Sequence, residues 1–324
     1  MALICSADFA ESVTENKGLY VNGISQGDFP LDNGFVSAGI KEQLIQIADF
    51  AKAHGYKRIY FEAVNESKAM YRSIALQQCE CLKNTDIDPL KELISVCHSE
   101  NIEVIAVISP LYAGKLTEDL NKLGIFAAKS EKYYVSDENG NCYYDPTSKE
   151  VAKYVLRIAE EIAKRYDVDG ELISGFGLSE ELTMKINGNV NSALEEIMRE
   201  IRTVTQGKKL GIEITAKDGI SSMFGDYDGN YAAVFDTGVD FAVIVAEEDF
   251  SEQAEIWGAI CKTGGIDWTI KIDFSGIEQA AYQKKDDYRS VFEKKETASY
   301  FGAEGSAESG YRYLLFTIDN GRTL

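Results

Sequence analysis

Short apolar segments alternate with longer amphipathic segments along almost the whole chain. The apolar segments are typical of β-strands, because they are short and rich in Val, Ile, Leu and aromatic residues. Residues 102–108 are apolar at almost every position, as expected of a strand that is buried on both faces. Eight strands are predicted in this way, at residues 17–24, 58–64, 102–108, 168–173, 209–215, 240–245, 268–272 and 313–318.

The amphipathic segments between these strands predict helices. Residues 38–54 place their apolar side chains on one stripe, and Gly55 then ends the helix. A second helix runs to about residue 100, with Asp88 as its N-cap and Pro89 in its first turn. Further helices are predicted at 116–123, 145–166, 191–204, 251–261 and 277–297, and a polar segment rich in tyrosine occupies 129–144.

This alternation of eight strands with helices predicts a (β/α)8 TIM barrel of the α/β class. The main alternative is a doubly wound sheet, which would carry a glycine-rich phosphate-binding turn after an early strand. Residues 25–30 follow the first strand and read Ser-Gln-Gly-Asp-Phe-Pro, which lacks that pattern. Only 4 prolines occur and no low-complexity linker interrupts the chain, so we expect a single domain over residues 1–324.

The composition is that of a globular protein with a strongly acidic surface. The chain has 324 residues and a formal net charge of −20. This charge repels phosphate backbones, which disfavours nucleic acid and anionic membranes as partners, and its simplest role is solubility. No apolar run is long enough for membrane insertion, and the first residues lack the basic start and apolar stretch of a signal peptide.

Cysteine and histidine give little indication of a metal or a cofactor. Six cysteines are scattered without a Cys-x-x-Cys pair, and only two histidines are present. A zinc site and a cofactor are therefore not predicted. Cys79 and Cys81 could flank a metal, although free or buried thiols are the simpler interpretation.

Three stretches resemble a known family. The sequence Arg-Tyr-Asp-Val-Asp-Gly at 165–170 follows an Asp-Pro turn at 145–146 and a long helix. Asp-Pro-Leu at 88–90 precedes Ile-Ser-Pro-Leu-Tyr at 108–112, and Gly-Asn-Val-Asn at 188–191 precedes Leu-Gly-Ile at 210–212. In this order they resemble the bacterial glycosyl-hydrolase-like barrel family of cell-envelope proteins. In that family an Asp-Pro turn leads through a helix into a YDVDGIHFDDY-type strand.

The resemblance implies glycosidase chemistry. Members of the family are expected to cleave glycosidic bonds, with bacterial cell-wall glycan as one substrate class and the cell envelope or the extracellular space as the location. Such cleavage needs two carboxyl groups that flank the scissile bond. In a barrel these groups lie at the C-terminal ends of the strands, where side chains converge on one pocket.

The chain departs from the family pattern at the expected catalytic positions. The paired acidic residues that the family carries after its fourth strand correspond to Ser174 and Gly175. The family's histidine in that strand corresponds to Leu172. Asp167 and Asp169 are retained, but they lie at the N-terminal start of the strand, where turn or capping roles are expected.

Replacement carboxylates are available near the strand ends. Glu62 lies near the end of the second strand, Glu213 lies within the fifth, and Glu247 follows the sixth. Glu213 is informative because its strand is otherwise apolar and burying a lone charge is costly. It is expected either to point into the barrel mouth or to pair with a base such as Lys271. All three glutamates are catalytic candidates, although a solvated acidic loop is the simpler interpretation of Glu247.

Polar and aromatic residues near the strand ends are candidate substrate contacts. Aromatic rings can stack on the apolar faces of sugars, and polar groups can bond the sugar hydroxyls. The tyrosines at 129–144 could form a lip over the pocket or pack against the barrel rim. The candidates are Asn22, Asn65, Tyr71, Ser109, Tyr112, Ser174, Phe176, Lys271 and Asp273.

Three functions remain open. The chain is an active glycosidase with relocated carboxylates, a barrel that binds carbohydrate after losing catalysis, or a structural module whose mouth is filled by side chains. The replaced pair at Ser174 and Gly175 favours the second function, with an oligosaccharide or polysaccharide as the partner. The sequence leaves the oligomeric state open, and fold analogy alone does not decide the function because barrels host many chemistries.

Overall fold

The computed structural model describes residues 18–23, 29–30, 37–53, 55–116, 131–216, 236–246, 261, 263–272 and 314–317. The helices predicted at 116–123, 251–261 and 277–297 lie almost wholly outside the described residues.

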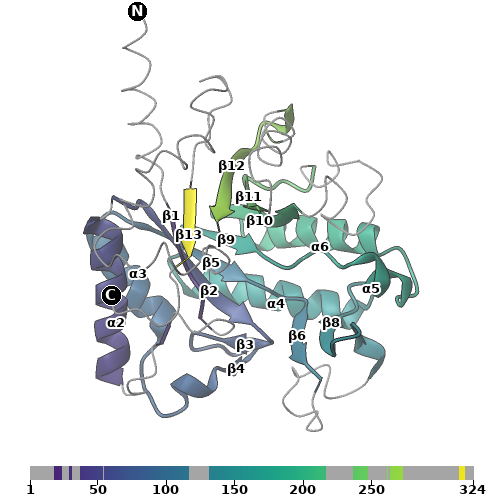
Figure 1. Ribbon diagram of the computed structural model, residues 1–324, viewed down its shortest axis with the longest axis horizontal. Helices are drawn as coiled ribbons and strands as arrows, with labels where there is room; N and C mark the ends of the chain where they lie inside the picture. The colour runs from purple at the N-terminus through teal and green to yellow at the C-terminus, as the bar shows by residue number, and fades with distance from the viewer. Residues whose placement is uncertain are drawn as a thin grey trace, which may run out of the picture.

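Eight parallel strands form the centre of the fold (Figure 1). Each of them corresponds to one of the eight strands predicted from the hydrophobic pattern, so the α/β arrangement is confirmed. Strand β1 pairs in parallel with both β2 and β13, which makes the pairing order of the eight strands cyclic. In that order they are β1 (Gly18–Val21), β2 (Arg58–Asn65), β5 (Glu103–Ile108), β9 (Gly170–Ile173), β10 (Lys209–Ala216), β11 (Phe241–Ala246), β12 (Asp267–Ile272) and β13 (Leu314–Thr317).

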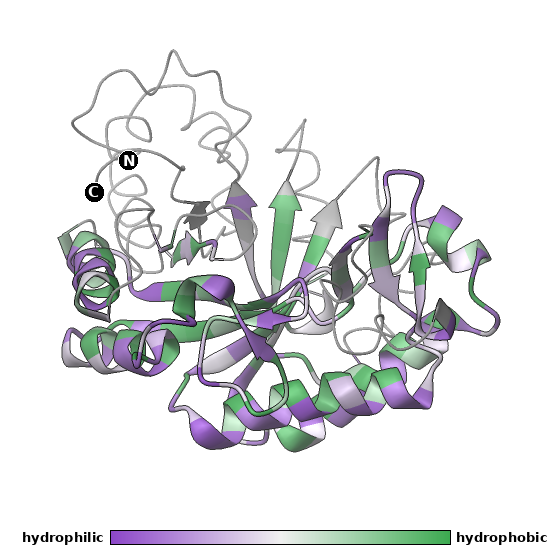
Figure 2. Cartoon of the chain, turned by 90° about the horizontal axis from the view of Figure 1, so that it is seen from below, coloured by the Kyte–Doolittle hydropathy of each residue, from purple (hydrophilic) through white to green (hydrophobic). Residues whose placement is uncertain are grey.

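The described helices cover the strands in pairs, with α2 against α3 and α4 against α6 (Figure 1). Hydrophilic and hydrophobic residues alternate along them, as expected of helices that bury one face only (Figure 2). Four match predicted helices, whereas the short α5 was not predicted. The helices are α2 (Ser37–Ala53), α3 (Pro89–Ser99), α4 (Lys149–Arg165), α5 (Glu180–Met184) and α6 (Val190–Val204).

Side-chain caps set where these helices begin. The predicted N-cap of α3 is confirmed, because Asp88 Oδ1 accepts a hydrogen bond from the Lys91 backbone N–H at 3.3 Å. The predicted start of α4 at residue 145 is corrected. That helix begins at Lys149, since the Ser148 hydroxyl accepts from the Val151 N–H.

Two smaller groups of strands accompany the ring, one attached to β2 and one forming a separate sheet. Strands β3 (Lys68–Ala69) and β4 (Gln77–Gln78) continue from the end of β2, and a short 3-10 helix follows at Glu80–Leu82. The described part of the tyrosine-rich segment forms an antiparallel sheet with β6 (Tyr112–Lys115), in which β8 (Asn141–Tyr144) pairs with both β6 and β7 (Tyr134–Ser136).

The interior of the strand ring is filled by side chains. They form a cluster distinct from the larger core between strands and helices. The rings of Tyr60 and Phe241 meet edge to face at a centroid distance of 6.4 Å. Gly211 makes room for them, because a Cβ at this position would lie 2.2 Å from the Phe241 ring. The cluster comprises Tyr20, Tyr60, Ile105, Val107, Leu172, Phe241 and Val243.

Asp169 fastens the N-terminal end of β9 to its neighbours. Its Oδ2 accepts hydrogen bonds from the Val104 backbone N–H at 2.7 Å and lies 3.0 Å from His98 Nε2. Asp167 is largely exposed and pairs with Lys208 at 3.1 Å. Both aspartates therefore have structural partners at the N-terminal face, as predicted.

Glu171 is a fully buried carboxyl group on β9. Neither of its oxygens has a hydrogen-bond partner among the described residues. Burial raises the pKa of Glu171 well above its ordinary value, because an apolar environment disfavours the charged form. The folded protein therefore retains a proton that the unfolded chain releases.

We predict that the stability of Glu171→Gln relative to wild type increases as the pH rises. Above the ordinary glutamate pKa the folded state binds more protons than the unfolded state, so wild-type stability falls with increasing pH. The slope from this group is at most about 1.4 kcal/mol per pH unit. Thermal denaturation at pH 5 and pH 8 measures it, with the exposed Glu160→Gln as the control. A stability difference between Glu171→Gln and wild type that is the same at both pH values would contradict this account.

Candidate functional site

Two of the predicted carboxylates lie directly above the filled interior of the strand ring. Side chains two positions apart on a strand face the same way. Glu62 follows the inward Tyr60 on β2, and Glu213 follows the inward Gly211 on β10. Both glutamates therefore project into the ring at its C-terminal end, which we call the mouth.

Glu213 is held by two neighbours from other strands. Lys271 on β12 forms an ion pair with Glu213, with Nζ 3.2 Å from Oε2. The Ser174 hydroxyl, just after β9, donates a hydrogen bond to Glu213 Oε1 at 2.6 Å. The Lys271 and Glu213 side chains are 13% and 10% exposed, so this is a largely buried pair. The sequence left two alternatives for Glu213, which were to face the mouth or to pair with Lys271. In the structure it does both.

Lys271 links two sides of the ring. Its Nζ lies 3.7 Å from the centroid of the Tyr20 ring on β1, in addition to its contact with Glu213 on β10. In the cyclic strand order β11 separates β12 from β10, and β13 separates β12 from β1. The ammonium group thus forms part of the floor of the mouth, between a carboxylate and an aromatic face.

Glu62 is fixed by the residues at the ends of β1 and β2. The Gly23 backbone N–H donates to Glu62 Oε2 at 2.8 Å, and Asn65 Nδ2 donates to Oε1 at 2.6 Å. Asn22 and Asn65 are themselves buried, at 5% and 8% exposure. Glu62 and Asn65, both predicted from the sequence, are thereby brought into contact, and Asn22 precedes Gly23 at the end of β1.

Glu62 and Glu213 stand on separate parts of the ring wall. Strands β5 and β9 lie between β2 and β10, so three steps of about 4.8 Å separate the two strands along the sheet. Both side chains face the inside of the ring at its C-terminal end. Ser109 follows β5 between them and is 9% exposed.

Two predicted aromatic contacts are deeply buried. Tyr71 is 0% exposed and its ring packs edge to face on Tyr166 at a centroid distance of 5.3 Å. Phe176 is 1% exposed and belongs to the core between strands and helices. Rings this buried could stack on a sugar only if the core repacked.

Tyr112 lies in the small antiparallel sheet rather than among the glutamates. Its ring packs on Tyr143 at 5.3 Å and its hydroxyl donates to Asn141 Oδ1 at 3.3 Å. Glu247 and Asp273 lie outside the described residues.

Sequence reasoning missed the role of Gly23 and the reach of Lys271 to Tyr20. Gly23 follows Asn22 directly after the first strand, which is a turn-like pair, but nothing in the sequence indicates that its N–H binds Glu62. The Lys271–Tyr20 contact joins residues at opposite ends of the chain. Such a contact exists only once the ring of strands has formed.

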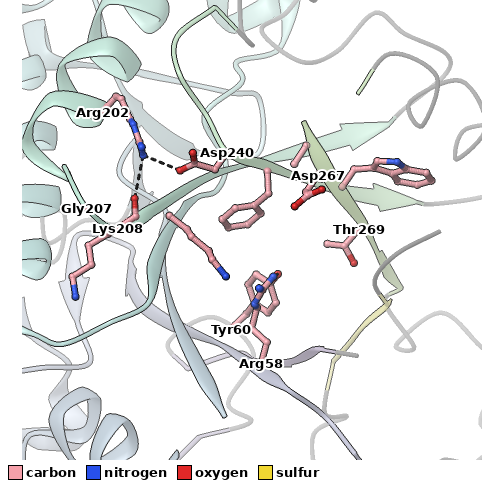
Figure 3. A pocket seen from close by; sticks show the side chains of 12 residues that line it. Arg58, Tyr60, Arg202, Gly207, Lys208, Asp240, Asp267 and Thr269 are labelled. Carbon is pink, nitrogen blue, oxygen red and sulfur yellow. Dashed lines mark hydrogen bonds and ion pairs between the residues drawn. The ribbon is translucent and has the colours of Figure 1, made fainter. Parts of the chain in front are cut away.

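A cavity of about 420 Å³ opens at the other end of the strands (Figure 3). It lies at the starts of β2, β10, β11 and β12. Arg202 bonds Asp240 at 2.8 Å and the Lys208 carbonyl at 3.1 Å. Arg58 and Lys209 pair with Glu103, and Lys208 pairs with Asp167. Each of the four cations that line this cavity therefore has a carboxylate partner.

Within the described ranges, no group of three or more His, Cys, Asp or Glu side chains is arranged to hold a metal ion. In the same part of the chain, no helix combines the length and apolar character needed to cross a bilayer.

The chain is similar in sequence to glycosyl hydrolases. Residues 17–184 match the family model described as Glycosyl hydrolase-like 10. A stretch of 166 residues is 25% identical to Glycosyl hydrolase YngK of Bacillus subtilis (strain 168), and it covers 49% of this chain and 32% of that protein. The chain thus spans about a third of this relative.

Solved structures similar to this fold are carbohydrate-active enzymes. The chitobiase of Flavobacterium johnsoniae has a TM-score of 0.54 and 11% identity, over 94% of this chain and 44% of that one. A maltogenic alpha-amylase, AmyB, of Thermotoga neapolitana has a TM-score of 0.52 and 12% identity, over 96% of this chain and 68% of that one. At this identity the likeness establishes the α/β fold of parallel strands and helices alone.

We predict that Lys271→Met lowers the free energy of unfolding by about 3 kcal/mol, because it leaves the buried Glu213 carboxylate without its partner. The double variant Lys271→Met, Glu213→Gln should recover most of that loss. Urea denaturation of the single and double variants measures both effects.

Lys164→Met is the matched control, since Lys164 forms an exposed pair with Glu160. Its loss should cost no more than about 0.5 kcal/mol. Equal urea midpoints for Lys271→Met and wild type would show that the Lys271–Glu213 pair is not a stabilising contact.

Proposed function

Because this chain belongs to the glycosyl hydrolase-like 10 family, we propose that its C-terminal mouth binds a carbohydrate and that hydrolysis has been lost. The ligand class is an oligosaccharide or polysaccharide, with bacterial cell-wall glycan as the first group to test. The observation that carries the proposal is the environment of Glu213. Its two oxygens are engaged by Lys271 and Ser174, whereas a glycosidase needs carboxyl groups free to act on substrate.

The segment after β9 supports the loss of catalysis. By resemblance, the acidic pair of the family falls at Ser174 and Gly175. The Ser174 hydroxyl donates a hydrogen bond to Glu213. Gly175 has a φ of +57°, a left-handed conformation that glycine adopts without strain. A serine donor and a left-handed glycine suit a binding surface better than a proton-transfer pair.

The groups around the mouth suit sugar hydroxyls. Asn22, Asn65, Ser109 and Ser174 carry amide or hydroxyl groups that both donate and accept hydrogen bonds. Lys271 and Glu213 add one donor and one acceptor of full charge beside them. Carbohydrate recognition needs such a mixture, because each sugar hydroxyl is both a donor and an acceptor.

An active glycosidase is the second candidate, and one observation favours it. Glu62 and Glu213 face the inside of the ring from separate strands, and acid–base hydrolysis uses two carboxyl groups that face one substrate. In that case Glu62→Gln and Glu213→Gln would each remove turnover.

We predict that the purified chain binds at least one class of glycan without releasing reducing ends. Calorimetric titration with peptidoglycan fragments, chitin oligosaccharides and α-glucans measures binding, and a reducing-end assay on the same mixtures measures hydrolysis. Asn65→Ala and Ser174→Ala should each weaken binding about tenfold, which is about 1.4 kcal/mol. Ser99→Ala, at an exposed site on α3, is the matched control and should bind as wild type does.

Two results would contradict the proposal in different ways. Turnover that Glu62→Gln and Glu213→Gln both abolish would replace lost catalysis with the active glycosidase. Binding that is equal in wild type, Asn65→Ala and Ser174→Ala would place the glycan elsewhere than the mouth.

A further inference from the structure

Three sulfur atoms converge beside the mouth, at the end of β3 and β4. Cys81 Sγ lies 2.9 Å from Cys79 Sγ and 3.8 Å from Met70 Sδ. Cys79 and Cys81 are partly exposed free thiols, whereas Met70 is 0% exposed. The cluster is therefore closed on the side of the core and reachable from solvent through the two thiols.

Backbone hydrogen bonds hold the three residues in this arrangement. The Met70 N–H donates to the Ala63 carbonyl and the Cys79 N–H donates to the Ala69 carbonyl, each at 2.9 Å. The Leu82 N–H donates to the Cys79 carbonyl at 2.9 Å and closes the short 3-10 helix that carries Cys81. The main chain therefore holds the three side chains next to one another, and the two thiols would move apart to admit an ion between the sulfur atoms.

We propose that Met70, Cys79 and Cys81 form a binding site for one soft monovalent metal ion, Cu(I). Thiolate and thioether sulfur are the ligands that select Cu(I), and three sulfur atoms complete a trigonal site for it. Zinc would need a fourth ligand and binds thioether sulfur poorly. Among the described residues no third His, Cys, Asp or Glu joins the two cysteines in a metal-binding group, and the Met70 thioether lies 3.8 Å from Cys81 Sγ as the third ligand.

Binding is a ligand exchange without electron transfer. Each thiol loses its proton to solvent, the two thiolates and the neutral thioether each donate an electron pair, and the ion remains Cu(I). The product carries one net negative charge.

The site lies next to the Glu62 cluster without sharing a residue with it. A Cβ placed at Gly23 would meet Met70 Cγ at 3.2 Å and the Glu62 carbonyl oxygen at 3.2 Å. Gly23 also donates its N–H to the Glu62 carboxylate. Metal bound at Met70 would therefore be packed against the segment that positions Glu62, while the metal test itself remains independent of glycan binding.

The test is a Cu(I) titration of the reduced full chain under argon, with a chromophoric Cu(I) chelator as competitor. We expect one Cu(I) per chain, a charge-transfer absorption in the ultraviolet, and the loss of two thiols that react with a disulfide reagent. Cys79→Ser and Cys81→Ser should each weaken binding at least a hundredfold. Met70→Leu, which conserves volume, should weaken it about tenfold.

Met184→Leu is the matched control, because Met184 is 75% exposed on α5, and it should bind as wild type does. The double variant Cys79→Ser, Cys81→Ser retains the other cysteines, so Cu(I) uptake equal to wild type would assign the metal to those and overturn the proposal. Absence of Cu(I) uptake by reduced wild type would also overturn it. A Cys79–Cys81 disulfide that forms in air, with no metal uptake after reduction, would identify the pair as a redox couple instead.

Discussion

The packed interior of the strand ring is the constraint on which the mouth depends. Tyr60 and Phe241 occupy the space between the strands, and Gly211 is the position that leaves room for the Phe241 ring. This packed layer closes the inside of the ring below the mouth. The next inward side chains along β2 and β10 therefore lie above it, at the C-terminal end. Glu62 and Glu213 are the first polar side chains above this apolar layer on their strands. The candidate site begins at these two residues.

Charge balance then determines what the mouth can do. The Lys271–Glu213 pair is largely buried, so separating it would expose each partner to a large desolvation cost. Lys271 also lies over the Tyr20 ring, which ties β12 to β1 as well as to β10. The same contact that stabilises the floor of the mouth thus restrains the carboxylate best placed for chemistry. This links the stability of the ring to the proposed loss of hydrolysis.

The proposed glycan site at the mouth and the sulfur cluster lie next to each other and differ in their chemistry. Oxygen and nitrogen groups line the first, whereas sulfur atoms from Met70, Cys79 and Cys81 make up the second. Gly23 separates them, with its N–H on Glu62 and its Cα close to Met70. A side chain at this position would press on the Glu62 carbonyl oxygen and on the Met70 side chain, so both would have to shift slightly.

The sequence by itself determined the alternation of strands and helices, since apolar periodicity and caps such as Asp88 are local properties. It also identified Glu213 as unusual, because a carboxylate in an apolar strand needs a partner. Only the tertiary structure decided that this partner is Lys271 with Ser174, that Tyr71 and Phe176 are core residues, and that three sulfur atoms meet. These contacts join residues distant in the chain, and they depend on which side chains the ring of strands brings to the same depth.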